Sequence, residues 1–330
     1  MRASRQSLAA AGLSPADAAR LGDGPLLAPA RDWLNGANRC LLTQADPAFP
    51  DTLRALPDAP AALFCEGDPD LLSTLQLAIV GSRNPTPAGE RHAFQFARAL
   101  AGRGLAICSG LALGIDGAAH RGALAADGLT LAVTGCGLDI CYPASHQALA
   151  RDIAQRGLLL SEYPPGTAPQ RENFPRRNRL ISGLSFGTLV VEAAPRSGSL
   201  ITARLAAEQG REVFAIPGSV DNPLARGCHR LIRAGAKLVE TADDVLEELG
   251  PMMDNKRQPT RSEPPAASSA LDEDYQLLLK HIDNAPMSID ALVEATGLPV
   301  DSVSSMLLIL ELQGAVAVAP GGGYQRSESR

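Results

Sequence analysis

Short apolar runs alternate with longer amphipathic segments through the middle of the chain. The runs LAIVG (77–81), LTLAVTG (129–135) and GTLVVEA (187–193) are mainly apolar and are flanked by glycine, which is typical of strands buried on both faces of a sheet. Similar runs at 104–110, 157–163, 212–218 and 236–240, and helical segments near 86–102, 114–126, 145–156, 199–209 and 224–234, complete the pattern. This alternation predicts an α/β fold built on a Rossmann-like, doubly wound, mostly parallel sheet.

The pattern changes on either side of this segment. We expect residues 1–38 to form a short N-terminal helical segment, with Ser14 as an N-cap. Residues 39–250 form the predicted Rossmann-like domain, and its two first apolar runs, CLLT and AALFCEG, indicate edge strands or an approach arm. The polar, proline-rich residues 251–268 predict a linker. Three helical segments and a terminal β-wing in residues 269–325 predict a winged-helix domain.

Charge is divided unevenly along the chain, whose net charge is −6. Residues 269–325 contain eight acidic residues and only Lys280 as a base, a net charge of −7, whereas residues 1–268 sum to zero. The third helical segment, 300–313, contains no Lys or Arg. Because a DNA-reading winged helix needs cations that contact phosphates, we interpret this domain as a protein-interaction module, with a merely solvated acidic domain as the alternative.

The cysteines form no metal-binding pattern. They show no CxxC pair and no His/Cys ligand spacing, so we expect reduced thiols and neither a metal site nor disulfides at Cys40, Cys65, Cys108, Cys136, Cys141 and Cys228. No apolar run approaches the roughly 18 residues of a membrane span, and the N-terminus lacks the sustained apolar segment of a signal peptide. We therefore expect a cytoplasmic protein without membrane association.

Small polar residues and arginine recur where the predicted strands end or the next helix begins: Arg83, Ser109, Gly110, Ser197, Gly198 and Ser199. In a parallel sheet, ligands bind beyond the carboxyl ends of the strands. The unpaired N–H groups and the dipole of a helix N-terminus favour an anion there. The sequence therefore predicts an extended rim that binds phosphate groups.

The segment FPRRNRLISG (174–183) brings cations to this rim. We expect Asn173 to cap a helix with Pro175 near its first position. On that helix Arg176 and Arg179 are three residues apart and share a face, which we expect to lie towards solvent and to contact phosphate. Arg177 projects towards apolar residues and is predicted to be partly buried and structural. The nucleic-acid-binding residues expected in this segment are Arg171, Phe174, Arg176, Arg177, Asn178 and Arg179. Phe174 is either a base-stacking platform, as in sequence-tolerant single-strand binders, or a core residue.

Known nucleotide-binding motifs are missing. The first strand is followed by GSRNPTPAGE instead of GxGxxG, and no GxxxxGK[ST] occurs, so we expect no NAD, no P-loop nucleotide and no other cofactor. Asp116 and His120, four residues apart on one helix, could act as an acid–base pair, and Glu162 and Glu192 end neighbouring strands. We interpret the first pair as a structural hydrogen bond and the glutamates as partners of arginines, and we predict no catalytic residues.

Seven motifs occur in an order that resembles one protein family. They are VGSR (80–83), SGLALGIDGAAH (109–120), SEYPPG (161–166), FPRRNRLISG (174–183), VVEAAPRSGSLITA (190–203), VFAIPG (213–218) and GCHRLIRAGA (227–236). The set resembles the DNA processing protein A (DprA/Smf) family of bacteria. The resemblance implies a homodimer that binds single-stranded DNA in a basic groove including Arg83, Phe174, Arg177 and Arg179. It also implies a role in competence, where such proteins protect incoming DNA during natural transformation and load the RecA recombinase, without catalysis.

Two features depart from the family's pattern, and two other functions remain open. The N-terminal helical segment is shorter than usual, and His229 stands where asparagine is usual. One alternative is a nucleotide N-glycosidase of the lysine-decarboxylase-like type, whose PGGxGTxxE loop is partly matched by residues 185–188 with Glu192. The other is a transcription regulator that uses the terminal domain, which the acidic charge of that domain disfavours.

Overall fold

The computed structural model describes residues 27–257, 273–283, 286–312, 315–319 and 323–326. The chain divides into two compact units, Met1–Gln258 and Pro259–Arg330. Each unit has a hydrophobic core of its own.

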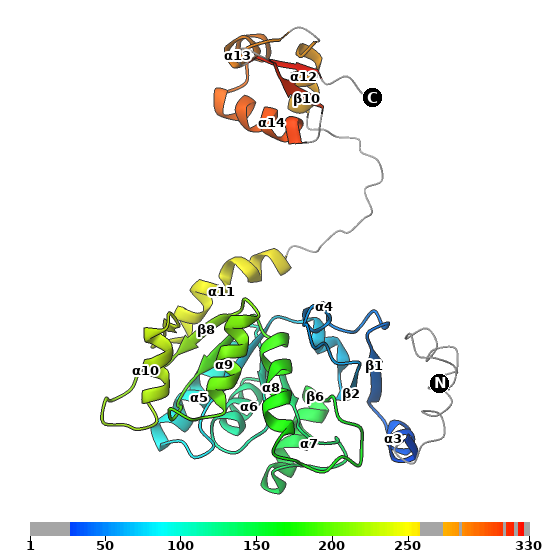
Figure 1. Ribbon diagram of the computed structural model, residues 1–330, viewed down its shortest axis with the longest axis vertical. Coiled ribbons are helices and arrows are strands. Elements are labelled where there is room, and N and C mark those ends of the chain that lie inside the picture. The colour runs from blue at the N-terminus through cyan, green and yellow to red at the C-terminus, as the bar shows by residue number, and fades with distance from the viewer. Residues whose placement is uncertain (1–26, 258–272, 284–285, 313–314, 320–322, 327–330) are drawn as a thin grey trace. The chain divides into compact units, whose positions relative to one another are not determined.

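A nine-stranded sheet forms the centre of the first unit (Figure 1). Its strands are β1 (Arg39–Thr43), β2 (Ala62–Gly67), β3 (Gln76–Val80), β4 (Ala106–Ser109), β5 (Thr130–Val133), β6 (Leu158–Ser161), β7 (Gly187–Val190), β8 (Glu212–Ala215) and β9 (Lys237–Leu238). Their order is β1-β2-β6-β5-β4-β3-β7-β8-β9, and all neighbours from β6 to β9 are parallel. β1 and β2 are antiparallel additions, so β1 is an edge strand whereas β2 lies inside the sheet. The predicted mostly parallel α/β fold is confirmed.

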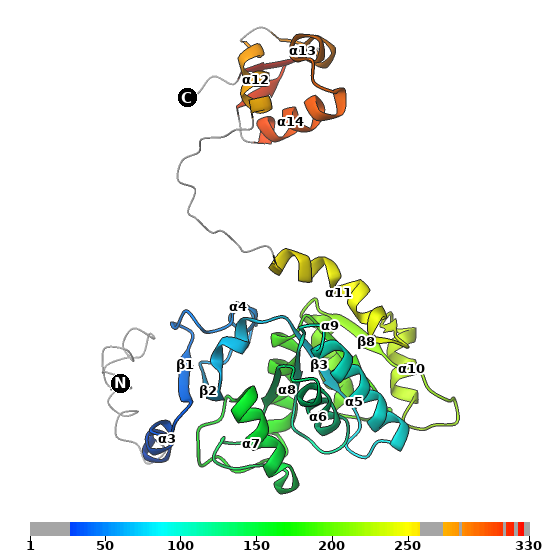
Figure 2. The ribbon, with the colours of Figure 1, turned by 180° about the vertical axis from the view of Figure 1, so that it is seen from behind.

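Helices cover both faces of this sheet, as the two opposite views show (Figures 1 and 2). One face packs on α4 (Asp51–Arg54), α8 (Asn173–Leu184), α9 (Ser199–Glu208) and α10 (Arg226–Arg233). The other packs on α5 (Pro87–Ala101), α6 (Ile115–Ala125), α7 (Gln147–Arg156) and α11 (Ala242–Arg257). The two-residue period of a strand explains both cores, because Ala78 and Val80 of β3 face the first layer while Leu77 and Ile79 face the second.

Shorter elements complete the first unit. α3 (Leu27–Leu34) lies beside β1, and its Trp33 ring packs edge-on against Phe64 of β2 at 6.1 Å between ring centroids. Two 3-10 helices, η1 (Pro69–Ser73) and η2 (Ala144–His146), precede β3 and α7. The helix expected after Ser14 lies outside the described residues.

Helix α11 runs past the expected start of the linker. It includes Pro251 and continues to Arg257, so residues 251–257 are helix and not linker. The proline removes one backbone donor, but the two methionines and the lysine that follow it are good helix formers. The rest of the expected linker, 258–268, lies outside the described residues.

The second unit contains α12 (Glu273–His281), α13 (Ile289–Thr296) and α14 (Val300–Leu312), followed by the antiparallel strands β10 (Val316–Val318) and β11 (Tyr324–Arg326). Ser288 caps α13 by accepting a hydrogen bond from the N–H of Ala291, and Gly297 ends the helix in the left-handed conformation at φ 70°. Three helices followed by a two-stranded wing are the predicted winged-helix arrangement.

Candidate nucleic-acid interface

A cavity of about 760 Å³, called the switch-point cavity below, opens at the carboxyl end of β3. From β3 the strand order proceeds through β4 to β6 on one side and through β7 to β9 on the other. The segments that follow β3 and β7 therefore lead to helices on opposite faces of the sheet, α5 and α9, and diverge around the cavity. Ligands bind at such reversals of strand order in open α/β sheets. The expected residues that line the cavity are Arg83, Arg171, Phe174, Arg177, Asn178, Ser197, Gly198 and Ser199.

Arg177 forms the floor of the switch-point cavity. It is only 4% exposed, and its guanidinium donates hydrogen bonds to the carbonyl oxygens of Gly110, at 2.7 Å, and Val133. Asp116 accepts hydrogen bonds from the N–H groups of Gly110 and Ala112 at 3.2 and 3.3 Å. Burial raises the pKa of Asp116, and the charge of Arg177 opposes that rise. Arg177 is therefore partly structural, as expected, because it ties α8 to the ends of β4 and β5.

Two aromatic rings and an arginine stand together on the wall. The ring centroids of Tyr142 and Phe174 lie 5.5 Å apart, and the Arg83 guanidinium lies 5.4 Å from the centroid of Phe174. Phe174 is half-buried, whereas Tyr142 is 46% exposed. The two rings are tilted by 37°, and the exposed Tyr142 ring can stack on a planar base while the adjacent guanidinium donates hydrogen bonds to its phosphate.

The N-terminus of α9 also lies at the cavity. The helix begins at Ser199, and the side chains of Ser197 and Ser199 are 2.7 Å apart at its N-terminus. Asn178 of α8 donates to the carbonyl oxygen of Gly198 at 3.4 Å, which joins this loop to the arginine helix. The N–H groups of Leu200 and Ile201 donate to the carbonyl oxygens of Ser197 and Gly198, at 3.2 and 3.1 Å, so the helix dipole and the half-buried Ser197 hydroxyl are what favour an anion here.

The cavity wall also carries unpaired cations. In the part of the chain that the structure describes, Arg83, Arg171 and Arg196 are exposed and none forms an ion pair with a carboxylate. Exposed arginines without acidic partners can bind phosphate bidentately. The cavity therefore combines exposed cations, a helix N-terminus and aromatic surface.

Four of the residues expected to bind nucleic acid do not line this cavity: Ser109, Gly110, Arg176 and Arg179. Ser109 is fully buried and donates to the carbonyl oxygen of Ile79 at 2.6 Å, and Gly110 is held between Arg177 and Asp116. Arg176 is exposed on α8 but does not line the cavity. Ser109 and Gly110 lie beneath the cavity. An added Cβ at Gly110 would lie 2.5 Å from Nη1 of Arg177, so a larger residue there would have to displace the buried guanidinium.

The expectation that Arg179 faces phosphate from solvent is wrong. Its side chain is 11% exposed and forms a bidentate ion pair with Glu162, at 2.7 and 2.9 Å. It also binds the carbonyl oxygen and the carboxylate of Asp58, at 2.9 and 2.8 Å. The expected role of Glu162 as a partner of an arginine is confirmed.

The other candidate catalytic groups are held in structural contacts. Glu192 accepts hydrogen bonds from the N–H and Oγ1 of Thr86, at 2.8 and 2.7 Å, and from Asn222, so it secures the start of α5. Within the part of the chain that the structure describes, it forms no ion pair with an arginine, contrary to expectation. Asp116 and His120 do not bond to each other, because Nδ1 of His120 bonds to Oγ1 of Thr130 at 2.7 Å. Burial lowers the pKa of His120 to about 3, which keeps the ring neutral.

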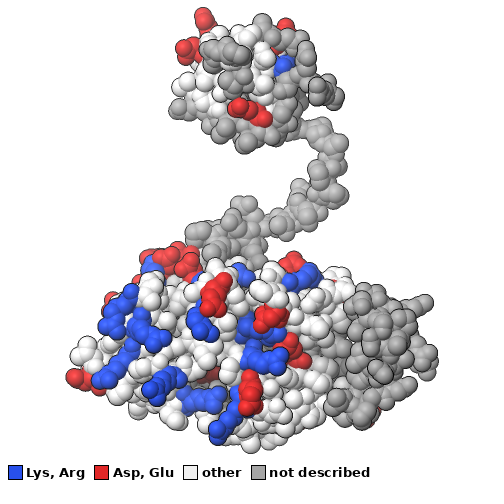
Figure 3. All heavy atoms as spheres, viewed as in Figure 1, with Lys and Arg blue, Asp and Glu red and all other residues white. Residues whose placement is uncertain are grey.

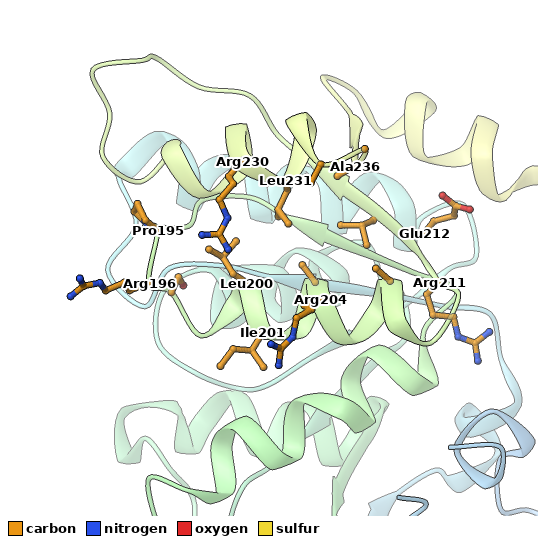
Figure 4. Close-up of a pocket in the computed structure, with 16 residues that line it drawn as sticks. Pro195, Arg196, Leu200, Ile201, Arg204, Arg211, Glu212, Arg230, Leu231 and Ala236 are labelled. Carbon is orange, nitrogen blue, oxygen red and sulfur yellow. The ribbon is translucent and has the colours of Figure 1, made fainter. Parts of the chain in front are cut away.

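A second cavity, of about 660 Å³, adjoins the first between α9 and α10. Arg196 and Ser197 line both cavities, and Arg204, Arg211 and Arg230 line the second. Arg230 extends from α10 towards Leu200 of α9 (Figure 4). Lys and Arg side chains gather on this face of the unit (Figure 3). The cationic surface therefore continues beyond the switch-point cavity. This continuation is consistent with the extended phosphate-binding rim that the sequence predicts.

Three site residues were missed by the sequence analysis. Tyr142 lies in a loop without periodicity, and only its place before Pro143 marks it as a turn residue. Arg196 adjoins the Ser-Gly-Ser loop, which was a usable signal, and Asp116 was considered only as a partner of His120. His229 of α10 lines neither cavity, and its Nε2 lies 3.0 Å from the carbonyl oxygen of Gly218.

Among the described residues, no group of three or more His, Cys, Asp or Glu side chains is arranged to hold a metal ion. None of the helices within the described ranges has the length and apolar character needed to cross a bilayer.

Comparison with known proteins places the chain in a family. The sequence model of the family named DNA recombination-mediator protein A matches residues 40–250, and that of the DprA winged helix domain matches residues 262–322. Protein Smf of Escherichia coli is 45% identical over 294 residues, which cover 88% of this chain and 78% of that protein.

Solved structures agree with this assignment. DNA processing protein A of Streptococcus pneumoniae has 46% identity and a TM-score of 0.62, over 64% of this chain and 75% of that one. The Helicobacter pylori protein, described for its single-stranded DNA binding mode, has 34% identity and a TM-score of 0.59, over 65% and 96%. The chain therefore belongs to the DNA recombination-mediator protein A family.

Proposed function

We propose that this protein binds single-stranded DNA in the switch-point cavity. The observation that carries the proposal is the grouping of three arginines without carboxylate partners, the start of α9 and a partly exposed aromatic pair around one cavity. Cations and backbone donors bind the phosphates of any sequence, and rings stack on any base. The Helicobacter pylori relative, which is described as a single-stranded DNA binder, supports the same ligand here.

The wider role follows from the family. We propose that the protein protects incoming DNA during natural transformation, loads the RecA recombinase on it and acts as a homodimer. Membership of a family of DNA recombination mediators supports this proposal. Size-exclusion chromatography with light scattering tests the dimer, and a strand-exchange assay with RecA tests the loading.

A comparison of single- and double-stranded oligonucleotides tests the binding proposal. We expect tighter binding of the single strand, and Arg83→Glu should weaken it at least tenfold, because a lost and reversed phosphate contact is worth more than about 1.4 kcal/mol. Arg98→Glu on α5, exposed on the opposite face of the sheet, is the matched control and should bind like the wild type. Equal affinity of the folded Arg83→Glu protein would refute the proposed site.

We also propose that the protein acts by binding and not by catalysis. Glu192 is the best candidate nucleophile for the N-glycosidase alternative, but its carboxylate is occupied by Thr86 and Asn222. Incubation with nucleoside monophosphates should release no free base. Turnover that is abolished by Glu192→Gln would favour the enzyme instead.

A further inference from the structure

The antiparallel pair of β1 and β2 places two cysteines opposite each other. Cys40 of β1 is the register partner of Cys65 of β2, and both pack against the core on the α4 and α8 side of the sheet. Directly opposed side chains lie on the same face with Cβ atoms about 4.5–5.5 Å apart. A disulfide requires about 3.5–4.5 Å, so a movement of about 1 Å brings the two sulfurs to bonding distance.

The two thiols differ in access to solvent. Cys65 is fully buried, whereas Cys40 is only partly buried. β1 is the edge of the sheet, so within the described residues it has a strand on one side only and can adjust its position. A reagent from solvent therefore meets Cys40 first, with Cys65 directly behind it.

The two thiols also differ in reactivity. A hydrogen bond with the Cys65 thiol lowers the pKa of Cys40 to about 7, although burial opposes the change. The same contact and burial raise the pKa of Cys65. Because the thiolate is the nucleophile, Cys40 is reactive at neutral pH while Cys65 keeps its proton.

We propose that Cys40 and Cys65 form a site of reversible disulfide modification by small-molecule disulfides. The Cys40 thiolate attacks one sulfur of the reagent, whose S–S bond breaks, and one thiolate leaves. Cys65 then loses its proton to solvent and attacks the Cys40 sulfur of the mixed disulfide, which releases the second thiolate. The two protein thiols are oxidised to one disulfide, and the reagent is reduced to two thiols.

The cross-link would act on a segment that supports the switch-point cavity. It closes the loop from residue 40 to residue 65, which contains Asp58, and Asp58 holds Arg179 of α8. Closing a loop of this size restricts the unfolded chain and stabilises the folded one. The inference goes beyond DNA binding and does not depend on it.

Oxidation of the full-length protein tests the site. Reduced protein is incubated with glutathione disulfide, alkylated and examined by intact mass and peptide mapping. We expect a mass loss of two hydrogen atoms, a linked pair of peptides containing Cys40 and Cys65, and reversal by dithiothreitol. The Tm should rise by roughly 5 °C or more on oxidation.

Single variants separate the roles of the two sulfurs. Cys65→Ser should retain a stable glutathione adduct on Cys40, whereas Cys40→Ser should leave Cys65 unmodified. Cys141→Ser is the matched control, because Cys141 is also partly buried but burial raises its pKa. This variant should form the disulfide like the wild type.

Three results for the wild type would overturn the proposal. They are an unmodified Cys40, a glutathione adduct on Cys40 that never resolves, and a link that uses another cysteine. Because peptide mapping of the wild type gives these results directly, a variant that fails to fold does not alter the conclusion.

Discussion

At the scale of single residues, Tyr142 is the exposed member of the aromatic pair with Phe174 and should contact a base. We expect Tyr142→Ala to weaken binding of a single-stranded oligonucleotide about tenfold, because stacking of one base on an aromatic side chain is worth about 1–3 kcal/mol. Tyr142→Phe should bind like the wild type, because the ring is retained. Fluorescence anisotropy with a labelled oligonucleotide measures both changes.

An oligonucleotide without bases provides the control for Tyr142. On an abasic strand the wild type and Tyr142→Ala should bind equally, because no base remains to stack. If Tyr142→Ala lost as much affinity on the abasic strand, then Tyr142 would act by supporting Phe174, 5.5 Å away, and not by contacting DNA.

His120 makes stability depend on pH. Its pKa is lowered to about 3 by burial, whereas a histidine in the unfolded chain titrates near 6.5. Between these values the unfolded chain binds the extra proton, so the free energy of unfolding decreases as the pH falls below about 6.5. The slope from this group approaches about 1.4 kcal/mol per pH unit.

Denaturant unfolding at several pH values measures the contribution of His120. His120→Asn can still donate to Thr130, which accepts from the native ring at 2.7 Å, but it does not titrate. The variant should therefore show a shallower fall in stability between pH 6.5 and pH 4.5. Parallel curves for the two proteins would contradict this assignment.

At the scale of elements, the sequence predicted what local patterns determine. The apolar runs flanked by glycine predicted the positions of β3 to β9 to within a few residues, because parallel strands buried on both faces are apolar along their length. The expected cap at Asn173 is wrong, because α8 includes this residue and its amide donates to the carbonyl oxygen of Gly135 at 3.1 Å. That contact joins segments far apart in the chain, and no local pattern encodes it.

The position of α8 depends on such a distant contact. Arg179 joins this helix to Glu162 at the end of β6 and to Asp58 after α4. Arg179→Met should lower the free energy of unfolding by about 2 kcal/mol, because it leaves the Glu162 carboxylate without its charged hydrogen bonds. Arg176→Met, exposed on the same helix and without an ion pair among the described residues, is the control and should change stability little. Similar unfolding curves for the two variants would show that the ion pair does not anchor α8.

At the scale of the whole molecule, topology explains why the site could be predicted only in part. Glycine, serine and arginine after several strands indicated the ligand-binding edge, since parallel strands end together. Which loops actually meet depends on the strand order, which puts β3 between β4 and β7. The sequence alone does not give this order, so Tyr142 was missed and Ser109 was expected at the surface.

The division of charge between the two parts of the chain leads to the last prediction. Residues 269–325 carry a net charge of −7, and the third helix of the winged-helix unit, α14 (Val300–Leu312), contains no Lys or Arg. Such a surface repels phosphates, so a chain that ends at Ser269 should bind single-stranded DNA as tightly as the full chain or slightly more tightly. Any gain should shrink at higher salt, because exposed charges are screened beyond about 8 Å at physiological ionic strength.

Binding isotherms of the full and the shortened chain at two salt concentrations measure this effect. Circular dichroism and light scattering on both proteins control for loss of folding or of assembly. If the shortened chain remained folded and equally assembled but lost tenfold in affinity at both salt concentrations, the winged-helix unit would contact DNA directly. Its interpretation as a module for protein partners would then be wrong, because removal of a repulsive charge can only raise the affinity for DNA.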